Sequence, residues 1–223
     1  MGCGSGRWAK LVAPKIGKLS CIDPSIEALS VAKRSLAHLD NIIFLNAGVS
    51  DEPLPSNTQD FGYSLGVLHH IPDTQIALSK CVDMLKPGAP FLLYLYYKFD
   101  NRPIWYVFIW RITDMARRLI SIMPSSLKSS LTNIIAMLVY FPLARLALFG
   151  EKIGLKVDRW LLSSYRRTSF YTMRTDSRDR FGTPLEKRFT RSEIKSMILA
   201  AGLNDIHFSE NFPFWCAVGK KKL

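Results

Sequence analysis

The 223-residue sequence lacks the patterns that mark metal sites, disulfide scaffolds and phosphate-binding loops. Its four cysteines, Cys3, Cys21, Cys81 and Cys216, show no CxxC spacing, which argues against a zinc site and a disulfide framework. The pattern GxxxxGK[ST] is absent, and no His, Cys or acidic residues have a convincing ligand spacing. We therefore expect no metal, and a reducing, cytoplasmic environment is the default.

Acidic residues are also scarce. The 18 Asp and Glu residues face 30 Lys and Arg residues, which gives a formal net charge of +12. Residues 98–191 hold about eighteen of the basic residues and about seven of the acidic ones. Such an excess favours an anionic substrate, a membrane surface or nucleic acid, or it forms a solvated basic face, and charge alone does not choose among these.

Long apolar runs are missing as well. Residues 1–6 form a glycine-rich turn rather than the basic residues and apolar core of a signal peptide. The most apolar stretch, residues 134–149, contains Pro142 and Arg145 and is shorter than the ~20 apolar residues that a bilayer requires. We expect this stretch to form a buried or interfacial helix.

Short apolar segments alternate with segments of helical spacing through the first hundred residues. The pattern predicts strands at residues 18–22, 42–45, 61–68 and 90–97, with helices at 25–39 and 74–85. Strands that alternate with helices of this length form parallel sheets covered on both faces. The expected class is therefore α/β, with a doubly wound, mostly parallel sheet in a core domain at residues 1–97.

The alternation stops at residue 98, where aromatic side chains such as Trp105, Phe108 and Trp160 appear among arginines. The pattern predicts helices at residues 103–122 and 127–149, so residues 98–187 are expected to form a helical, basic, aromatic-rich insertion. Helical insertions after the fifth strand of such a sheet lie beside its ligand-binding edge and form a cap. The aromatic residues are expected to pack between helices rather than to stack on nucleic-acid bases.

Regular structure is expected to return in residues 188–223. Thr190 and Glu193 form a capping box for a helix that runs to Ala201 and stops at Gly202. Residues 206–208 and 214–218 are then predicted to form a closing antiparallel pair of strands that completes the core.

The candidate ligand site begins with three closely spaced glycines, Gly2, Gly4 and Gly6, which allow a ligand to lie almost against the main chain. Asp23 ends the next apolar run, 17 residues after Gly6. A carboxylate at this position accepts hydrogen bonds from the hydroxyls of a ribose. Together these residues predict a nucleoside-containing ligand at the carboxyl edge of the sheet, although a glycine cluster alone is often an ordinary turn.

Further motifs follow in a fixed order and carry a family resemblance. They are GCGSG at residues 2–6, CIDPS at 21–25, QDF at 59–61, SLGVLHHIPD at 64–73 and LKPG at 85–88. This arrangement resembles the class I S-adenosylmethionine-dependent methyltransferases, specifically the type 11 group, which have a Rossmann-like fold. The resemblance covers residues 1–97 well and residues 190–219 less specifically.

The resemblance implies S-adenosylmethionine as the cofactor and assigns the residues that bind it. The glycine turn would lie under the methionine part and the ribose, Asp23 would hold the ribose hydroxyls, and a segment beside the adenine would include Gly48, where the family usually has an acidic residue. Asp51 or the backbone of Val49 would have to replace that residue. The complete expected set is Gly2, Cys3, Gly4, Gly6, Asp23, Pro24, Gly48, Val49, Leu65 and Gly66.

Two histidines, His69 and His70, follow the fourth strand of the family's fold and are the candidates for a general base. The alternative is that one histidine packs in the core and the other caps the helix after Pro72 and Asp73. Tyr96 and Tyr97 lie past the next strand, where they would line a substrate pocket or belong to the core. A segment at residues 179–189 would reach back over the pocket or simply mark a turn.

The family has one strand before the glycine turn, and it is absent from this sequence, which starts at Met1. Because that strand is central in the family's sheet, its absence is expected to leave two half-sheets with unpaired edges. The sequence is accordingly interpreted as a fragment or as one with a misplaced start.

The function predicted from these patterns is methyl transfer from S-adenosylmethionine to a small-molecule or lipid-like acceptor. The first alternative is a nucleic-acid methyltransferase, but residues 64–67 read SLGV where enzymes that methylate exocyclic base amines carry Asn or Asp, Pro, Pro and an aromatic residue. The second is a non-catalytic, membrane-associated protein with a degraded methyltransferase fold. Peripheral membrane contact of an otherwise cytoplasmic protein remains open, and so does the oligomeric state.

Overall fold

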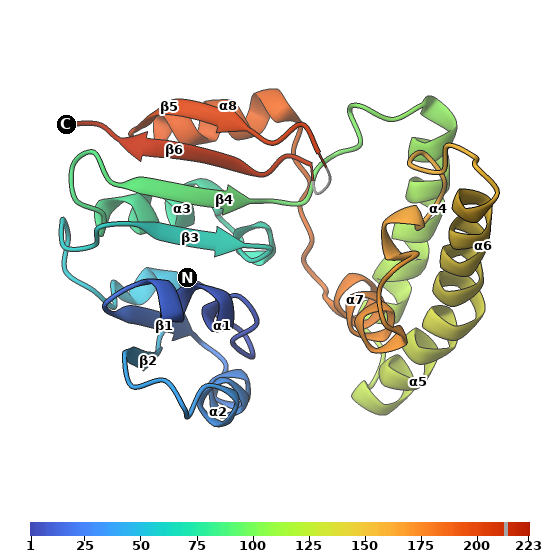
Figure 1. Cartoon of the computed structure of the whole chain (residues 1–223), viewed down its shortest axis with the longest axis horizontal. Coiled ribbons are helices and arrows are strands. Elements are labelled where there is room, and N and C mark those ends of the chain that lie inside the picture. Colours follow the sequence, from blue (N-terminus) through green and yellow to red (C-terminus); the bar gives the residue numbers. More distant parts are fainter. Residues whose placement is uncertain (212–213) are drawn as a thin grey trace. The chain divides into compact units, whose positions relative to one another are not determined.

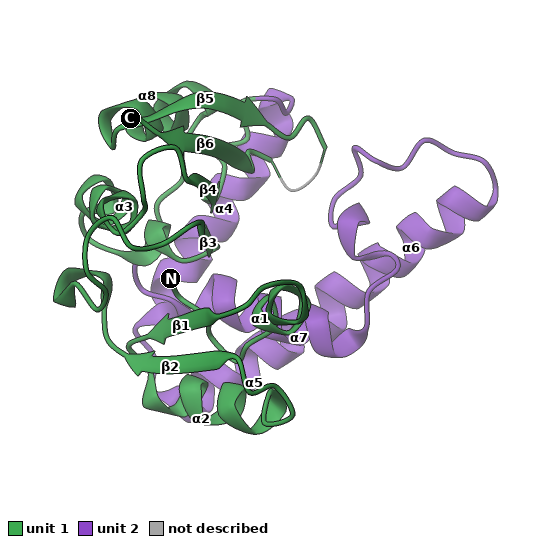
Figure 2. Cartoon of the chain, turned by 60° about the vertical axis from the view of Figure 1, so that its left-hand side comes forward, with its two compact units in different colours: residues 1–100, 187–223 green, residues 101–186 purple. Residues whose placement is uncertain are grey.

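The computed structural model describes residues 1–211 and 214–223. The chain divides into two compact units (Figure 2): unit 1 contains residues 1–100 and 187–223, and unit 2 contains residues 101–186. The sequence placed the corresponding limits at residues 98 and 187. Each unit is described by itself below.

Unit 1 alternates strands and helices, as its apolar pattern predicts. Its elements are α1 (Ala9–Val12), a 3-10 turn at Ala13–Lys15, β1 (Leu19–Asp23), α2 (Ile26–Ser35), β2 (Ile42–Asn46), a 3-10 turn at Val49–Asp51, β3 (Gly62–Leu65), a 3-10 turn at Leu68–His70, α3 (Thr74–Asp83), β4 (Pro90–Tyr94), α8 (Arg191–Ala200), β5 (Leu203–Phe208) and β6 (Ala217–Lys221). Figure 1 shows these elements in chain order from blue to red.

The strands of unit 1 form two sheets, with the orders β1-β2 and β3-β4-β6-β5. The pairs β1-β2 and β3-β4 are parallel, whereas β4-β6 and β5-β6 are antiparallel. The α/β class and the antiparallel closing pair are thereby confirmed, although β6 begins at Ala217 rather than at residue 214.

The division between the two sheets lies at β1 and β3. Residues 1–3 lie between these two strands. Gly2 and Cys3 donate backbone hydrogen bonds to the carbonyl of Ile22 in β1, and Met1 donates to the carbonyl of Tyr63 in β3. Among the described residues no strand pairs with β1 and β3 together. The expectation of two half-sheets is confirmed.

Side chains fix the starts of the unit 1 helices. Ser25 accepts a hydrogen bond from the N–H of Ala28, Asp73 from that of Ile76, and Thr190 from that of Glu193, so each satisfies an N–H that the first helical turn leaves without a partner. The Glu193 carboxylate returns a bond to the N–H of Thr190, which confirms the capping box. The helix starts of unit 1 are therefore encoded locally.

Unit 2 is helical. Its elements are α4 (Ile104–Ser121), α5 (Ser125–Ile135), a π-helical turn at Ala136–Tyr140, α6 (Phe141–Lys152), a 3-10 turn at Ser163–Tyr165 and α7 (Phe170–Gly182). Its core gathers Ile120, Tyr140, Ala144, Met173 and Phe181 from four of these segments. The predicted helix at residues 103–122 is confirmed by α4.

The second predicted helix is longer than the sequence pattern suggested. The π-helical turn joins α5 to α6, so residues Ser125–Lys152 run as one helix. The wide turn lies just before Pro142, which has no N–H to donate to the preceding turn, and it lets the helix continue past the proline.

By length and composition this helix is apolar enough to cross a membrane, with a mean hydropathy of 1.7 over its most apolar window and 28% of that window buried. The sequence suggested that residues 134–149 are too short to cross a bilayer. This is corrected, because they belong to a helix of 28 residues. The core helix of a soluble protein passes the same criterion, so it is weak evidence for a span.

The expectation that the aromatic residues of the insertion pack between helices holds only in part. Tyr140 is buried in the core of unit 2, but Trp105 and Phe108 are exposed. The reason lies in α4, which buries Ile120 and two polar side chains but leaves most of its large apolar side chains exposed. Its buried residues are Arg117, Ile120 and Ser121.

Candidate functional site

The three glycines at the start of the chain have different surroundings. All three have a positive φ, which favours glycine. A Cβ on Gly2 would lie 2.3 Å from Val67 Cγ2, and a Cβ on Gly6 would lie 2.8 Å from Leu36 Cδ1, so close packing also requires glycine there. A Cβ on Gly4 would have no protein atom within 4 Å. Gly4 is therefore the glycine of this turn that borders open space.

The glycine turn is bound to the end of β1 through Asp23. The backbone N–H of Gly4 donates to Oδ2 of Asp23 at 2.8 Å, and the N–H of Ser25 donates to Oδ1 at 3.0 Å. Asp23 is 9% exposed. Each carboxylate oxygen can accept more than one hydrogen bond, so this carboxylate holds the turn and keeps acceptor capacity for a ligand. Pro24 follows it and accepts from the amide of Asn46 at 3.0 Å.

Cys3, inside the glycine turn, has a thiol whose pKa is raised, first by its hydrogen bond with Cys21 and then by burial. It is half-buried and its Sγ contacts the carbonyl of Gly4. Because the thiolate is the nucleophilic form, this thiol is unsuited to nucleophilic chemistry. Its place in the site is a structural one.

The end of β2 carries the segment that the sequence assigned to adenine. The amide of Asn46 donates to the carbonyl of Asp23 at 3.2 Å, which joins the ends of β1 and β2. Asp51 accepts from the N–H of Gly48 at 2.6 Å and so closes the turn at Val49–Asp51. The Asp51 carboxylate therefore already has a hydrogen-bond partner within its own turn, and the Val49 side chain is buried.

The end of β3 brings Leu65 and Gly66 to the glycine turn. The N–H of Gly66 donates to the carbonyl of Tyr94 at 3.0 Å, and Gly66 has a φ of +77°. Val67 follows directly and is the residue against which Gly2 packs. The structure thus gathers the loops after β1 and β3 around the glycine turn, from three separate parts of the sequence.

The two candidate histidines differ in their environment. His69 is fully buried, neither of its ring nitrogens has a hydrogen-bond partner, and its ring stacks on Tyr96 with centroids 3.8 Å apart. Burial, and then the charges of His70 and Arg188, lower the pKa of His69 to about 2. The ring is therefore neutral and a weak proton acceptor. His70 is only half-buried, 4.1 Å from His69 between ring centroids.

Residues 187–189 return the chain to the histidines, and Arg188 was not singled out from the sequence. The N–H of Lys187 donates to the carbonyl of His69 at 3.1 Å, and that of Phe189 donates to the carbonyl of Tyr96 at 2.9 Å. The Arg188 guanidinium lies 5.1 Å from the centre of the Tyr96 ring. The only available signal was the position of this segment directly before the last helix.

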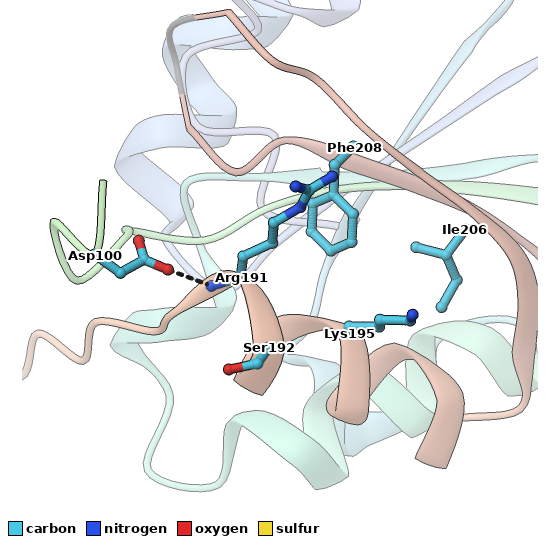
Figure 3. A pocket seen from close by; sticks show the side chains of 6 residues that line it. All are labelled: Asp100, Arg191, Ser192, Lys195, Ile206 and Phe208. Atoms are coloured by element: carbon cyan, nitrogen blue, oxygen red, sulfur yellow. Dashed lines mark hydrogen bonds between the residues drawn. The ribbon is translucent and has the colours of Figure 1, made fainter. Parts of the chain in front are cut away.

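A separate open cavity of about 510 Å³ lies in unit 1 away from these residues (Figure 3). It is lined by Asp100, Arg191, Ser192, Lys195, Ile206 and Phe208. Asp100 accepts from the N–H of Arg191 at 2.9 Å and from the indole of Trp215 at 2.8 Å. None of the predicted site residues lines it.

Comparison with known families finds a match to the methyltransferase domain over residues 1–93. The match contains the glycine turn, Asp23 and both histidines. It confirms the resemblance to the class I, type 11 methyltransferases, and this family implies S-adenosylmethionine as the methyl donor.

Two curated relatives are similar over the same part of the chain. An uncharacterized methyltransferase of Mycobacterium tuberculosis is 29% identical over 119 residues, which are 53% of this chain and 60% of the relative. A demethylmenaquinone methyltransferase of Staphylococcus aureus is 32% identical over 92 residues, 39% of this chain and 37% of the relative. The chain thus spans less than two thirds of the length of the curated relatives it matches.

Among solved structures, a SAM-dependent methyltransferase of Methanosarcina mazei aligns with a TM-score of 0.56 at 17% identity. The alignment covers 100% of this chain and 90% of that structure. At such low identity the likeness concerns the fold, and it confirms the Rossmann-like α/β class.

Proposed function

We propose that this chain, whose residues 1–93 form a methyltransferase domain of the type 11 group, transfers a methyl group from S-adenosylmethionine to a small-molecule or lipid-like acceptor. The observation that carries the proposal is the pairing of Gly4 with Asp23. A backbone without Cβ borders open space, and a buried carboxylate with spare acceptor capacity lies in hydrogen-bond contact with it.

This arrangement fits the nucleoside part of the cofactor. A ribose presents two adjacent hydroxyls, which are donors for one carboxylate. Gly4 leaves room for the ligand to approach the main chain, whereas Gly2 and Gly6 are needed for packing and hold the turn in place. In this proposal the loops after β2 and β3, with Gly48, Val49, Leu65 and Gly66, border the adenine and the rest of the cofactor.

The cofactor supplies a methyl group on a sulfonium with a very good leaving group, so the protein has mainly to hold acceptor and methyl in contact. An acceptor that must lose a proton requires a base nearby. His70 is better suited than His69, because His69 is fully buried and its pKa is lowered to about 2. In this proposal the rings of His69 and Tyr96 pack against His70 and have no part in proton transfer.

The acceptor class is inferred from two observations. One similar protein acts on demethylmenaquinone, which is a small molecule. Residues 64–67 also read SLGV rather than the Asn or Asp, Pro, Pro, aromatic motif of enzymes that methylate exocyclic base amines, which argues against a nucleic-acid acceptor of that kind. A cytoplasmic location is proposed from the sequence alone.

The proposal is tested by isothermal titration of the full chain with S-adenosylhomocysteine, and with NAD as the competing nucleoside ligand. We expect binding of the first and none of the second. Asp23→Asn is expected to weaken S-adenosylhomocysteine by about 100-fold, because two hydrogen bonds to a charged acceptor contribute roughly 1.5 kcal/mol each. The matched control is Asp40→Asn, an exposed carboxylate outside the site.

Because Asp23 also holds the glycine turn, a second variant separates binding from folding. Gly4→Ala places a methyl group in open space but strains a backbone with a φ of +51°, which costs about 1 to 3 kcal/mol. It is expected to weaken the ligand, and its thermal midpoint shows whether it remains folded. If the wild-type chain binds NAD and not S-adenosylhomocysteine, or if Asp23→Asn and Gly4→Ala both bind S-adenosylhomocysteine like the wild type, the proposal is wrong.

A further inference from the structure

Helix α4 of unit 2 has its polar side inward. Arg117 is 5% exposed, its Nε donates to Oδ1 of Asp114 at 2.7 Å, and its Nη1 donates to the carbonyls of Thr183 at 3.0 Å and Pro184 at 3.2 Å. On the same side Thr113 accepts from Arg180 at 2.9 Å. An ordinary surface helix buries its apolar face and exposes the polar one. In α4 the arrangement is largely reversed, because Ile120 is its one large apolar side chain that is buried.

The opposite side of α4 is apolar and exposed. It carries six side chains at spacings of three or four residues, so that they form one stripe along the helix. Their exposed fractions lie between 54% and 89%. We call this surface the α4 stripe, and it consists of Ile104, Phe108, Ile112, Met115, Leu119 and Ile122. A continuous apolar stripe of this kind marks a surface that contacts another apolar phase.

Basic side chains run along one edge of the α4 stripe. Arg111 lies three residues after Phe108 and four before Met115, and Arg118 has the same relation to Met115 and Ile122. Arg111 is exposed, and the Arg118 side chain is 74% exposed. Unit 2 as a whole has fourteen Lys and Arg residues against six Asp and Glu residues. The surroundings of the stripe are therefore complementary to an anionic surface.

We propose that the α4 stripe docks onto an anionic lipid surface. The apolar side chains enter the boundary between headgroups and acyl chains, while Arg111 and Arg118 remain at the level of the anionic headgroups. The inward polar face gives α4 a fixed attachment to unit 2, so the helix can present its apolar side without turning it inward. The proposal goes beyond methyl transfer, since it concerns a different unit from the cofactor site.

The test is co-sedimentation of the full chain with vesicles of a neutral lipid, with and without about 30 mol% of an anionic phospholipid. We expect binding to the anionic vesicles, at least about tenfold weaker binding to the neutral ones, and release at about 0.5 M salt. The Phe108→Ser, Ile112→Ser double variant is expected to bind at least about tenfold more weakly. The matched control is Ile26→Ser, Ile76→Ser, which removes two similarly exposed side chains from unit 1.

A second variant tests the charge independently of the apolar contact. Arg111→Glu is expected to weaken binding by at least about fivefold, because the loss of one basic residue at an anionic surface alone removes roughly 1 kcal/mol. Its control is Lys18→Glu, an exposed basic residue of unit 1. Both pairs of variants alter exposed positions, and their thermal midpoints show whether each is folded.

Several results would overturn the proposal. The wild-type chain would not bind anionic vesicles, or it would bind neutral vesicles equally well. A third such result is that both α4 variants bind anionic vesicles as strongly as the wild type does. A wild-type dimer that the double variant dissociates without lipid would assign the stripe to a second copy. Resistance of the bound protein to alkaline extraction would indicate insertion of Ser125–Lys152 instead. Failure here leaves S-adenosylhomocysteine binding intact, so the two proposals fail separately.

Discussion

Helices α8 of unit 1 and α4 of unit 2 differ in the side chains that they bury. The buried residues of α8 are Ile194 and Ile198, whereas those of α4 are Arg117, Ser121 and one large apolar residue, Ile120. The charge differs in the same way. Unit 1 has sixteen basic and twelve acidic residues, and unit 2 has fourteen and six in a shorter stretch. Unit 1 thus buries the apolar face of α8, and unit 2 leaves the α4 stripe exposed.

The comparison also extends to how helices begin. In unit 1, α2, α3 and α8 have capping side chains, whereas α4 and α5 of unit 2 begin after Pro103 and Pro124 without one. Proline fixes its own backbone φ before the helix, and its carbonyl accepts from the first turn, but its side chain cannot accept a capping hydrogen bond. The starts of α4 and α5 therefore depend more on packing within the unit, whereas α7 has a capping side chain, Ser169. Four experiments test these differences between unit 1 and unit 2.

The largest effect is expected from Arg117→Met. Arg117 is buried, and its removal leaves Asp114 with only the exposed Arg118 as an ion-pair partner, so the loss should cost about 3 kcal/mol. Two carbonyls also lose their donor. Urea unfolding should show this loss in unit 2. The control, Arg118→Met, removes an ion-pair partner that is 74% exposed and should cost less than about 1 kcal/mol. Equal effects of the two variants would mean that α4 is not attached through its polar face.

Met173→Ala and Met115→Ala compare the inside and outside of unit 2 with the same substitution. Met173 is 0% exposed in the unit 2 core, so its loss should cost about 2 to 5 kcal/mol. Met115 is 69% exposed on the α4 stripe, and its replacement should change the free energy of unfolding by less than about 0.5 kcal/mol. A large loss for Met115→Ala would show that the stripe is covered within the chain itself.

Thr190→Ala tests local encoding in unit 1. It removes the cap of α8 and half of the capping box, which should cost about 1 kcal/mol. Ser196→Ala in the exposed middle of the same helix is the control and should be close to neutral. Chemical denaturation followed by circular dichroism measures both. Should the two variants be equally stable, α8 would be held by packing alone, like the helices of unit 2.

The smallest effect is expected from pH. Burial by itself raises the pKa of Asp114, but the hydrogen bonds and charges of Arg117 and Arg118 outweigh it and hold the pKa below its usual value. A depressed pKa contributes stability that is present above the unfolded value of about 3.9 and is lost as pH falls through the folded value. The thermal midpoint of the wild type should exceed that of Asp114→Asn at pH 6, and the two should converge as the pH falls below about 4. A constant difference over this range would contradict the assignment.

The elements of unit 1 were predictable because their signals are local. Ile42 to Leu45 form a β-branched and apolar run, and Thr190 with Glu193 is a capping box, so β2 and α8 appear close to where the sequence places them. The difference between Gly4, which borders open space, and the glycines on either side of it, Gly2 and Gly6, was not predictable. Three glycines look alike in a sequence, and only the contacts with Val67 and Leu36 distinguish those needed for packing. Likewise, Arg188 meets Tyr96 through long-range pairing that no local pattern reveals.

The sequence by itself determined the α/β class, the order of the motifs, the basic and helical character of residues 101–186 and the likeness to a methyltransferase domain. Each of these depends on residue type and spacing along the chain. The tertiary structure decided which face of α4 points inward, which histidine is buried and which glycine borders open space. Those outcomes depend on contacts between residues far apart in the sequence, because a side chain's burial is set by what packs against it and not by its neighbours along the chain.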